Sequence, residues 1–196
     1  MSTPRVVAVS RDETHRFSKV PAESITLVAG IGVLGDAHAG TLVQHRFDSR
    51  RDPTQPNLRQ VHLIGSELFA DAREMGYDLG PGDLGENVLT AGLDLHALPT
   101  DTLLDLGGPV VRLTGQRNPC VLINRFRPGL LKVVLARADG TPLGRAVSSA
   151  SPDAATAPVI RRAGVMSVVE RGGEVVPGQS ITVTLPDEPH VPLVAM

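Results

Sequence analysis

The amino-acid sequence predicts a mainly β fold, a barrel-like domain of short strands with a few helices outside it. The 196 residues include 20 glycines and 16 prolines, and these turn residues recur between short β-branched runs. Short strands separated by frequent turns are typical of β-sandwiches and β-barrels. Near the carboxyl end, Ile181, Val183 and Leu185 alternate with two threonines, the two-residue period of a half-buried strand.

The same pattern of short β-branched runs between turn residues predicts eight strands. They cover residues 6–10, 25–29, 60–64, 87–90, 102–106, 110–114, 165–170 and 181–185. One helix is expected over residues 67–75, with Ser66 as its N-cap and Gly76 at the C′ position. Leu68, Phe69 and Ala72 share one face of that helix. A second helix is expected after Pro128.

Composition indicates one domain over residues 1–196, interrupted at residues 148–158 by a low-complexity segment expected to be a flexible surface insertion. The net charge of −2 does not indicate a nucleic-acid partner. No apolar run approaches the roughly 20 residues that cross a membrane. The single cysteine excludes an intrachain disulfide and fits the reducing cytoplasm, the expected location.

Three stretches are too particular to be scaffold alone. The first is Gly-Asp-Ala-His-Ala-Gly at residues 35–40. Its terminal glycines permit a tight loop, from which Asp36 can orient the imidazole of His38 for proton transfer. An alternative is a simple turn, with Asp36 bonded to its own backbone and His38 in solvent.

The second stretch is Gly-Pro-Gly-Asp-Leu-Gly-Glu-Asn at residues 80–87. The amides of Gly82 and Gly85, beside the polar side chains of Glu86 and Asn87, form a candidate site for an anionic or heterocyclic ligand. It lacks the Gly-Lys-Ser/Thr ending of a phosphate-binding P-loop. The alternative is a turn that leads into the strand at residues 87–90.

The third stretch, Arg117-Asn118-Pro119-Cys120, follows the strand at residues 110–114. Pro119 stiffens the approach to Cys120, and Arg117 can stabilise its thiolate, the form that acts as nucleophile and metal ligand. The alternative is an inert buried cysteine, which is the usual state of a lone thiol.

In their order and spacing these stretches resemble the MOSC (molybdenum cofactor sulfurase C-terminal) family. Further matching pieces are Arg-Gln-Val-His-Leu-Ile at residues 59–64, Gly-Val-Met at residues 164–166 and the turn at residues 172–178. The resemblance covers most of the chain and implies a closed β-barrel of MOSC type. Two departures, Gln179 in place of an acidic residue and the insertion at residues 148–158, concern the subfamily only.

The resemblance further implies that Cys120 is the sulfur-handling residue. Either it carries sulfur as a persulfide, or it ligates molybdenum in a bound molybdenum cofactor (molybdopterin) for the reduction of N-hydroxylated compounds. In the cofactor version Arg46, Arg59 and Arg117 are candidates for the pterin phosphate. Pyridoxal phosphate binding is also associated with the family.

In the sulfur version Cys120 accepts and passes on a sulfane sulfur, with Asp36 and His38 moving protons and Arg117 holding the sulfur anionic. The partners implied are a separate electron-donor or sulfur-donor protein and a small-molecule substrate, with no membrane. The alternatives are an enzyme that cleaves a C–S bond in a thiol-derived substrate and a non-catalytic ligand-binding barrel with an inert cysteine. A zinc hydrolase is disfavoured, because the histidines lack the spacings typical of zinc sites.

Overall fold

The fold is mainly β, as predicted, and is seen in a computed structural model that describes residues 3–137, 139–145 and 159–196. Its main sheet has eight strands in the order β13-β7-β8-β11-β5-β6-β1-β2. All neighbours are antiparallel except β5 and β6, which run parallel. The strands are β1 (Arg5–Arg11), β2 (Val20–Ala22), β5 (Val61–Gly65), β6 (Val88–Ala91), β7 (Leu103–Asp105), β8 (Val110–Gln116), β11 (Val165–Arg171) and β13 (Thr182–Thr184).

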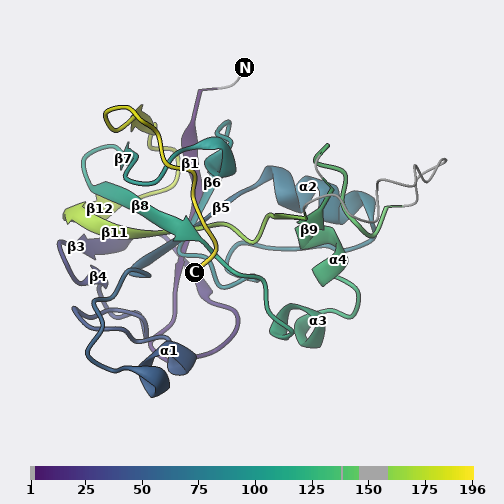
Figure 1. The fold of residues 1–196 in the computed structure, drawn as a ribbon, viewed down its shortest axis with the longest axis horizontal. Helices are drawn as coiled ribbons and strands as arrows, with labels where there is room; N and C mark the ends of the chain where they lie inside the picture. Colours follow the sequence, from purple (N-terminus) through teal and green to yellow (C-terminus); the bar gives the residue numbers. More distant parts are fainter. Residues whose placement is uncertain (1–2, 138, 146–158) are drawn as a thin grey trace.

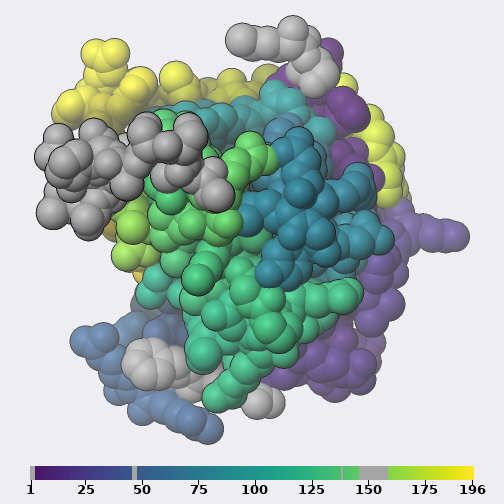
Figure 2. Space-filling view, turned by 90° about the vertical axis from the view of Figure 1, so that its right-hand side faces the viewer, coloured from purple at the N-terminus to yellow at the C-terminus, as the bar shows by residue number. Residues whose placement is uncertain are grey.

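Two smaller sheets and a set of short helices complete the described fold. One sheet joins β12 (Gly173–Val175), β3 (Ile25–Val28) and β4 (Gly32–Val33), and the other joins β9 (Leu135–Ala136) to β10 (Ile160–Arg161). The helices are α1 (Arg46–Arg51), α2 (Glu67–Glu74), η1 (Leu95–Ala97), α3 (Leu122–Phe126) and α4 (Leu131–Val134). Helices α2, α3 and α4 lie together on one side of the main sheet (Figure 1). Figure 2 looks onto that side, where α2 and the segment of α3 and α4 form one continuous surface.

The closed barrel expected from the sequence is not formed. Within the described residues no sheet closes on itself, and β13 and β2 remain the edges of the main sheet. The chain approaches closure at one point, where Arg5 forms an isolated bridge with Ser180. The bridge does not grow into a ladder because the chain leaves β1 there, and from Thr182 onward it pairs with β7.

The buried side chains form two apolar clusters. One is built from strands of the main sheet and the β3 sheet, and it includes Leu27, Leu63, Leu104 and Leu113. The other lies between the main sheet and the helices α2, α3 and α4. Burying each such side chain contributes roughly 1.5–3 kcal/mol, so the two clusters fix the loops that leave the sheet.

The eight predicted strands are all present, with ends that differ from the prediction by one or two residues. The helix at residues 67–75 is confirmed as α2, and Gly76 has the positive φ of 85° expected at its end. The prediction that Ser66 caps this helix is wrong. Its backbone is already helical (φ −64°, ψ −15°), and its side chain makes no capping hydrogen bond. The second predicted helix corresponds to α4, and the predicted insertion at residues 148–158 lies outside the described residues.

No helix in the described ranges is both long enough and apolar enough to span a bilayer.

Candidate functional site

Asp36 is the centre of a buried polar cluster in the loop after β4, and its side chain is only 1% exposed. Its Oδ2 accepts hydrogen bonds from Nζ of Lys19 and from Nδ2 of Asn87, the latter at 3.0 Å. Its Oδ1 accepts the backbone amide of His38 at 2.9 Å. Burial by itself would raise the pKa of Asp36, but the hydrogen bonds from His38 and the charge of Lys19 hold it well below its usual value. Asp36 is therefore an anion at neutral pH.

Lys19, which the sequence did not single out, is the counter-charge of Asp36. Its side chain is 6% exposed, and its backbone amide donates to the carbonyl of Gly82 at 2.8 Å. Burial lowers the pKa of Lys19, while the charges of Asp36 and Glu86 raise it. Lys19 thus connects the loop of Asp36 to the loop of Glu86.

His38 is the more accessible member of the pair that the sequence predicted. Its side chain is 28% exposed, and its Nδ1 lies 3.2 Å from Oδ1 of Asp36. The ring also lies beside that of His15, with 5.1 Å between the ring centroids. Burial and the charge of Lys19 lower the pKa of His38, against the opposing effect of Asp36. A neutral imidazole oriented by a carboxylate can accept a proton near neutral pH.

Replacing Asp36 by asparagine is expected to destabilise the protein by about 3–5 kcal/mol, because it leaves Lys19 buried without a counter-charge. Urea unfolding measures this change. The double variant Lys19→Met, Asp36→Asn removes both charges and should recover a large part of the loss. An unchanged unfolding midpoint in Asp36→Asn alone would show that Lys19 does not depend on this carboxylate. Because His38 is more exposed, His38→Gln is the better probe of proton transfer.

Residues 80–87 form a loop in which a backbone amide binds the carboxylate of another residue of the same loop. The amide of Gly82 donates to Oε1 of Glu86 at 2.5 Å, and Glu86 is 1% exposed. The other oxygen of Glu86, Oε2, is buried without a hydrogen-bond partner in the part of the chain described. Burial raises the pKa of Glu86 to about 7, although the Gly82 amide and the charge of Arg117 oppose this. Glu86 is therefore a buried acid that titrates near neutral pH.

The two central glycines allow this loop to pack against the segment before β2. Gly82 and Gly85 have φ values of 84° and 80°, in the left-handed region. A Cβ at Gly82 would lie 2.3 Å from the carbonyl oxygen of Lys19, and one at Gly85 would lie 2.5 Å from that of Phe17. Glycine is thus required at both positions for backbone conformation and for contact.

Replacing Glu86 by glutamine is expected to change how stability depends on pH. A carboxyl with a pKa of 4.5 when unfolded and about 7 when folded stabilises the fold while protonated, and this contribution disappears as the pH rises through 7. The native protein should therefore lose up to about 3 kcal/mol relative to Glu86→Gln between about pH 5 and pH 8. Urea unfolding of both proteins at both pH values measures the difference. Parallel pH profiles would contradict a raised pKa. The buried histidines have lowered pKa values, so their effect on the pH dependence of stability is opposite to that of Glu86. Because both proteins contain these histidines, their contribution cancels when the two proteins are compared.

Asn87 and His62 connect this loop to the sheet. Asn87 donates to the carbonyl of Ser10 at 3.1 Å and accepts the amide of His62 at 3.2 Å. The ring nitrogens of His62 both face carbonyls, Nδ1 that of Gly85 at 3.2 Å and Nε2 that of Ala163 at 2.8 Å. Burial and the charge of Arg117 put the pKa of His62 well below its usual value, so the ring is neutral and donates only one N–H. The shorter distance favours Nε2 as the donor.

Arg117 extends from the end of β8 and is fixed from several sides. Its Nη1 donates to the carbonyl of Leu84 at 2.8 Å, and its backbone amide donates to the carbonyl of Gly164 at 2.9 Å. The guanidinium carbon lies 5.8 Å from the ring centroid of Phe17, within cation–π range. The position of this cation is therefore set by three separate segments of the chain.

Cys120 is a free, partly buried cysteine three residues after Arg117, within electrostatic reach of that cation. Its carbonyl accepts the amide of Ile123 at 3.1 Å, which places it just ahead of α3. Burial lowers the pKa of Arg117, whereas the negative charges of Cys120 and Glu86 raise it. Both acidic groups thus lie within electrostatic reach of a guanidinium, which remains charged in proteins.

Arg59 lies near Arg117 but already has a partner. Its Nη2 is 3.2 Å from Oδ2 of Asp48, and the same carboxylate oxygen is 2.9 Å from Nδ1 of His45. The positive charge of Arg59 also lowers the pKa of Arg117, but this effect is smaller than those of burial, Cys120 and Glu86. The side chain of Arg46, the other predicted phosphate ligand, lies outside what the structure describes.

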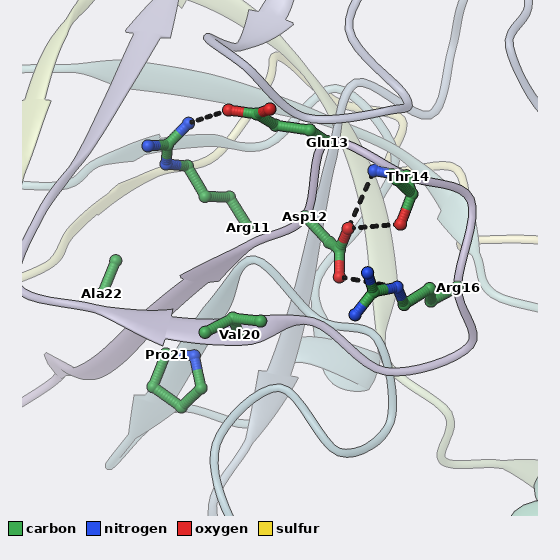
Figure 3. A pocket seen from close by; sticks show the side chains of 8 residues that line it. All are labelled: Arg11, Asp12, Glu13, Thr14, Arg16, Val20, Pro21 and Ala22. Atoms are coloured by element: carbon green, nitrogen blue, oxygen red, sulfur yellow. Dashed lines mark hydrogen bonds and ion pairs between the residues drawn. The ribbon is translucent and has the colours of Figure 1, made fainter.

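A surface pocket of about 380 Å³ lies around the end of β1, next to the polar cluster of Asp36 (Figure 3). Its two arginines are turned toward acidic side chains: Arg11 is 3.7 Å from Glu13, and Arg16 is 3.7 Å from Asp12. The amide of Asp12 also donates to Oδ2 of Asp36 at 3.3 Å. Both arginines of this pocket are therefore paired with carboxylates that also line it.

Comparison with known proteins decides the family. Residues 50–182 match the MOSC domain, and this segment holds most of the site described above. The chain belongs to the MOSC domain family. Its Cys120, Arg117 and Glu86 fall inside the matched segment, whereas Asp36 and Lys19 precede it.

Solved structures of two further proteins have a similar fold over nearly the whole chain. The YuaD protein of Bacillus subtilis is similar over 95% of this chain and 98% of its own, with a TM-score of 0.69 and 20% identity. YiiM of Geobacillus stearothermophilus is similar over 96% of this chain and 79% of its own, with a TM-score of 0.60 and 13% identity. At such low identity the similarity establishes the fold alone. Among curated proteins none matches the sequence.

MOSC domains are associated with the molybdenum cofactor, and the chemistry of the residues at Cys120 fits that group. The thiol of the partly exposed Cys120 is a soft ligand, and Arg117 supplies a fixed cation within electrostatic reach of it. Arg59 is the next cation, at present paired with Asp48. No group of three or more histidine, cysteine or acidic side chains in the described ranges is placed to hold a metal ion by itself.

The structure brings most of the predicted site residues of this MOSC domain into one region. Asp36, His38 and Asn87 form one cluster, and Arg117, Glu86 and Cys120 form the other. Lys19 joins them, because its charge acts on Asp36 and on Glu86. A lysine next to a polar turn gives no sequence signal for burial, so Lys19 could be found only in the fold.

Proposed function

We propose that this MOSC domain handles sulfur through Cys120, which accepts a sulfane sulfur and holds it as a persulfide anion beside Arg117. The observation that carries the proposal is a fixed guanidinium within electrostatic reach of a partly exposed free cysteine. Arg117 is anchored by the carbonyls of Leu84 and Gly164, so its charge stays in place when the sulfur becomes anionic. A preorganised cation stabilises such an anion without reorganisation.

In the proposed step the Cys120 thiolate attacks the outer sulfur of a donor persulfide, R–S–SH. A new S–S bond forms at Cys120 as the S–S bond of the donor breaks, and the donor leaves as the thiolate R–S⁻. No electrons are gained or lost overall. The proton on the transferred sulfur then passes to a base, and an acceptor thiolate later removes the same sulfur.

His38 is the proposed base, oriented by Asp36. Its accessible ring and lowered pKa support a neutral imidazole that can take up this proton. Glu86 is a second candidate for proton exchange, because its pKa of about 7 lets it change protonation near neutral pH. These roles make the protein a sulfurtransferase with a separate sulfur-donor partner.

A second candidate function is reduction of N-hydroxylated compounds with a bound molybdenum cofactor. The proximity of two cations, Arg117 and Arg59, favours it, because the pterin phosphate needs cationic partners. Cys120 would ligate the molybdenum, and Arg117 and Arg59 would bind the phosphate. The cofactor, when bound, supplies the two-electron redox centre, and a separate protein supplies the electrons.

The reactivity of Cys120 tests the proposal against an inert cysteine. Alkylation with iodoacetamide at neutral pH should proceed faster in the folded protein than with a model cysteine peptide. Denaturation in urea should bring the rate down to that of the peptide. If the folded protein instead reacts more slowly than the peptide, the cysteine is inert and the ligand-binding alternative takes its place.

A further inference from the structure

A second pocket, which shares no lining residue with the Cys120 site, lies where the end of β5, the start of α2 and the turn after β6 meet. Its volume is about 540 Å³, within the range of small-molecule binding sites. The strongest observation concerns Arg162 and His96, which both line it. Nη1 of Arg162 and Nδ1 of His96 are buried and have no hydrogen-bond partner in the described part of the chain.

These two atoms are held in place by the groups around them. Nη2 of Arg162 lies 2.5 Å from Oδ2 of Asp71, which fixes the guanidinium and leaves Nη1 as a donor. The amide of His96 donates to Oδ1 of Asp94 at 3.0 Å. Burial and the charge of Arg162 lower the pKa of His96 despite Asp94, so its ring is neutral. A buried polar atom without a partner destabilises the fold, and a ligand that satisfies it would recover that cost.

The charges of the pocket restrict what that ligand can be. Asp71 already neutralises Arg162, while Glu67 and Asp94 add two further carboxylates. Glu67 binds the amide of Gly92 through Oε1 at 2.8 Å, which leaves Oε2 for another donor. A ligand with only negative charge would be repelled here. A molecule with an acceptor for Arg162 and a cationic donor for Glu67 and Asp94 would satisfy both sides.

The remaining lining is apolar and comes from Leu68, Leu93 and Leu95. We propose that this pocket binds a small zwitterion with an apolar side chain, the chemistry of a free α-amino acid. Its carboxylate faces the guanidinium of Arg162, whose side chain is 18% exposed, its ammonium group faces Glu67 and Asp94, and its side chain lies against the leucines. The inference does not depend on the sulfur chemistry of Cys120.

Isothermal titration with three related probes tests the proposal on the full chain. L-leucine carries both charged groups, isocaproate lacks the amino group, and isoamylamine lacks the carboxylate. L-leucine is expected to bind saturably, and each partial probe at least about tenfold more weakly, since a charge-assisted hydrogen bond contributes about 1.5–3 kcal/mol. Absence of L-leucine binding up to about 10 mM, or equal binding of isocaproate, would overturn the proposal.

Two arginine variants locate the binding. Arg162→Lys keeps the charge beside Asp71 but loses the second donor of the guanidinium fork, so L-leucine should bind about tenfold more weakly. Arg73→Lys is the matched control, because Arg73 lies on α2 in an exposed pair with Asp78, 3.5 Å away. It should bind L-leucine as the native protein does. Circular dichroism confirms that both variants are folded, and unchanged binding by folded Arg162→Lys would contradict the assignment.

Discussion

Replacing Cys120 by serine is expected to abolish sulfur transfer, with a loss of about 10³-fold or more. The hydroxyl keeps nearly the size of the thiol, but it can neither form the S–S bond nor carry a sulfane sulfur. Transfer from a persulfide donor to a thiol acceptor, followed by cyanolysis of the remaining sulfane sulfur, measures the effect. No other cysteine in the sequence can replace Cys120.

The control for this variant is its stability. Because Cys120 is partly exposed and its hydrogen bond to α3 is made by its backbone carbonyl, Cys120→Ser should unfold at nearly the same urea concentration as the native protein. A folded Cys120→Ser variant that still transfers sulfur at the native rate would exclude Cys120 as the sulfur carrier.

The second large effect distinguishes Arg117 from its neighbouring cation Arg59. Arg117→Ala is expected to slow sulfur acceptance and alkylation at Cys120 by about 10- to 100-fold, since it removes the positive charge that acts on the sulfur. Arg59→Ala should leave both reactions nearly unchanged, because Arg59 is paired with Asp48. Second-order rates for a persulfide donor and for iodoacetamide report the two effects.

The same pair of variants tests the molybdenum-cofactor alternative. In protein purified from a host that makes the cofactor, that alternative predicts bound pterin and molybdenum, and it predicts their loss in Arg59→Ala. Sulfur carriage without the cofactor predicts no pterin in either protein. Equal effects of Arg59→Ala and Arg117→Ala on alkylation would contradict a specific role for Arg117.

Much of the fold could be predicted from local sequence, because strands of this protein are short and bounded by glycine or proline. The strand β8, for example, alternates buried Val111 and Leu113 with half-buried neighbours, a pattern that is visible in the sequence. The closure of the sheet was predicted wrongly. Closure depends on whether the residues around Ser180 pair with β1 or with β7. The local sequence pattern does not show which of these two pairings forms.

The candidate site could be predicted in its residue types but not in its partnerships. Gly82 and Glu86 were expected to contact a ligand, yet in the fold the amide of Gly82 binds Glu86 itself. Lys19 was missed, because only the tertiary fold places it against Asp36, 17 positions away in sequence. The unpartnered nitrogens of His96 and Arg162 likewise arise from segments that meet only in the folded chain.

Mass spectrometry of the peptide that contains Cys120 tests the central claim most directly. The folded protein is incubated with a persulfide donor, trapped with an alkylating agent under non-reducing conditions, and digested. The account predicts one additional sulfur atom on Cys120, removable by dithiothreitol and strongly reduced in Arg117→Ala. A Cys120 peptide that is alkylated in full but never carries the additional sulfur would contradict it.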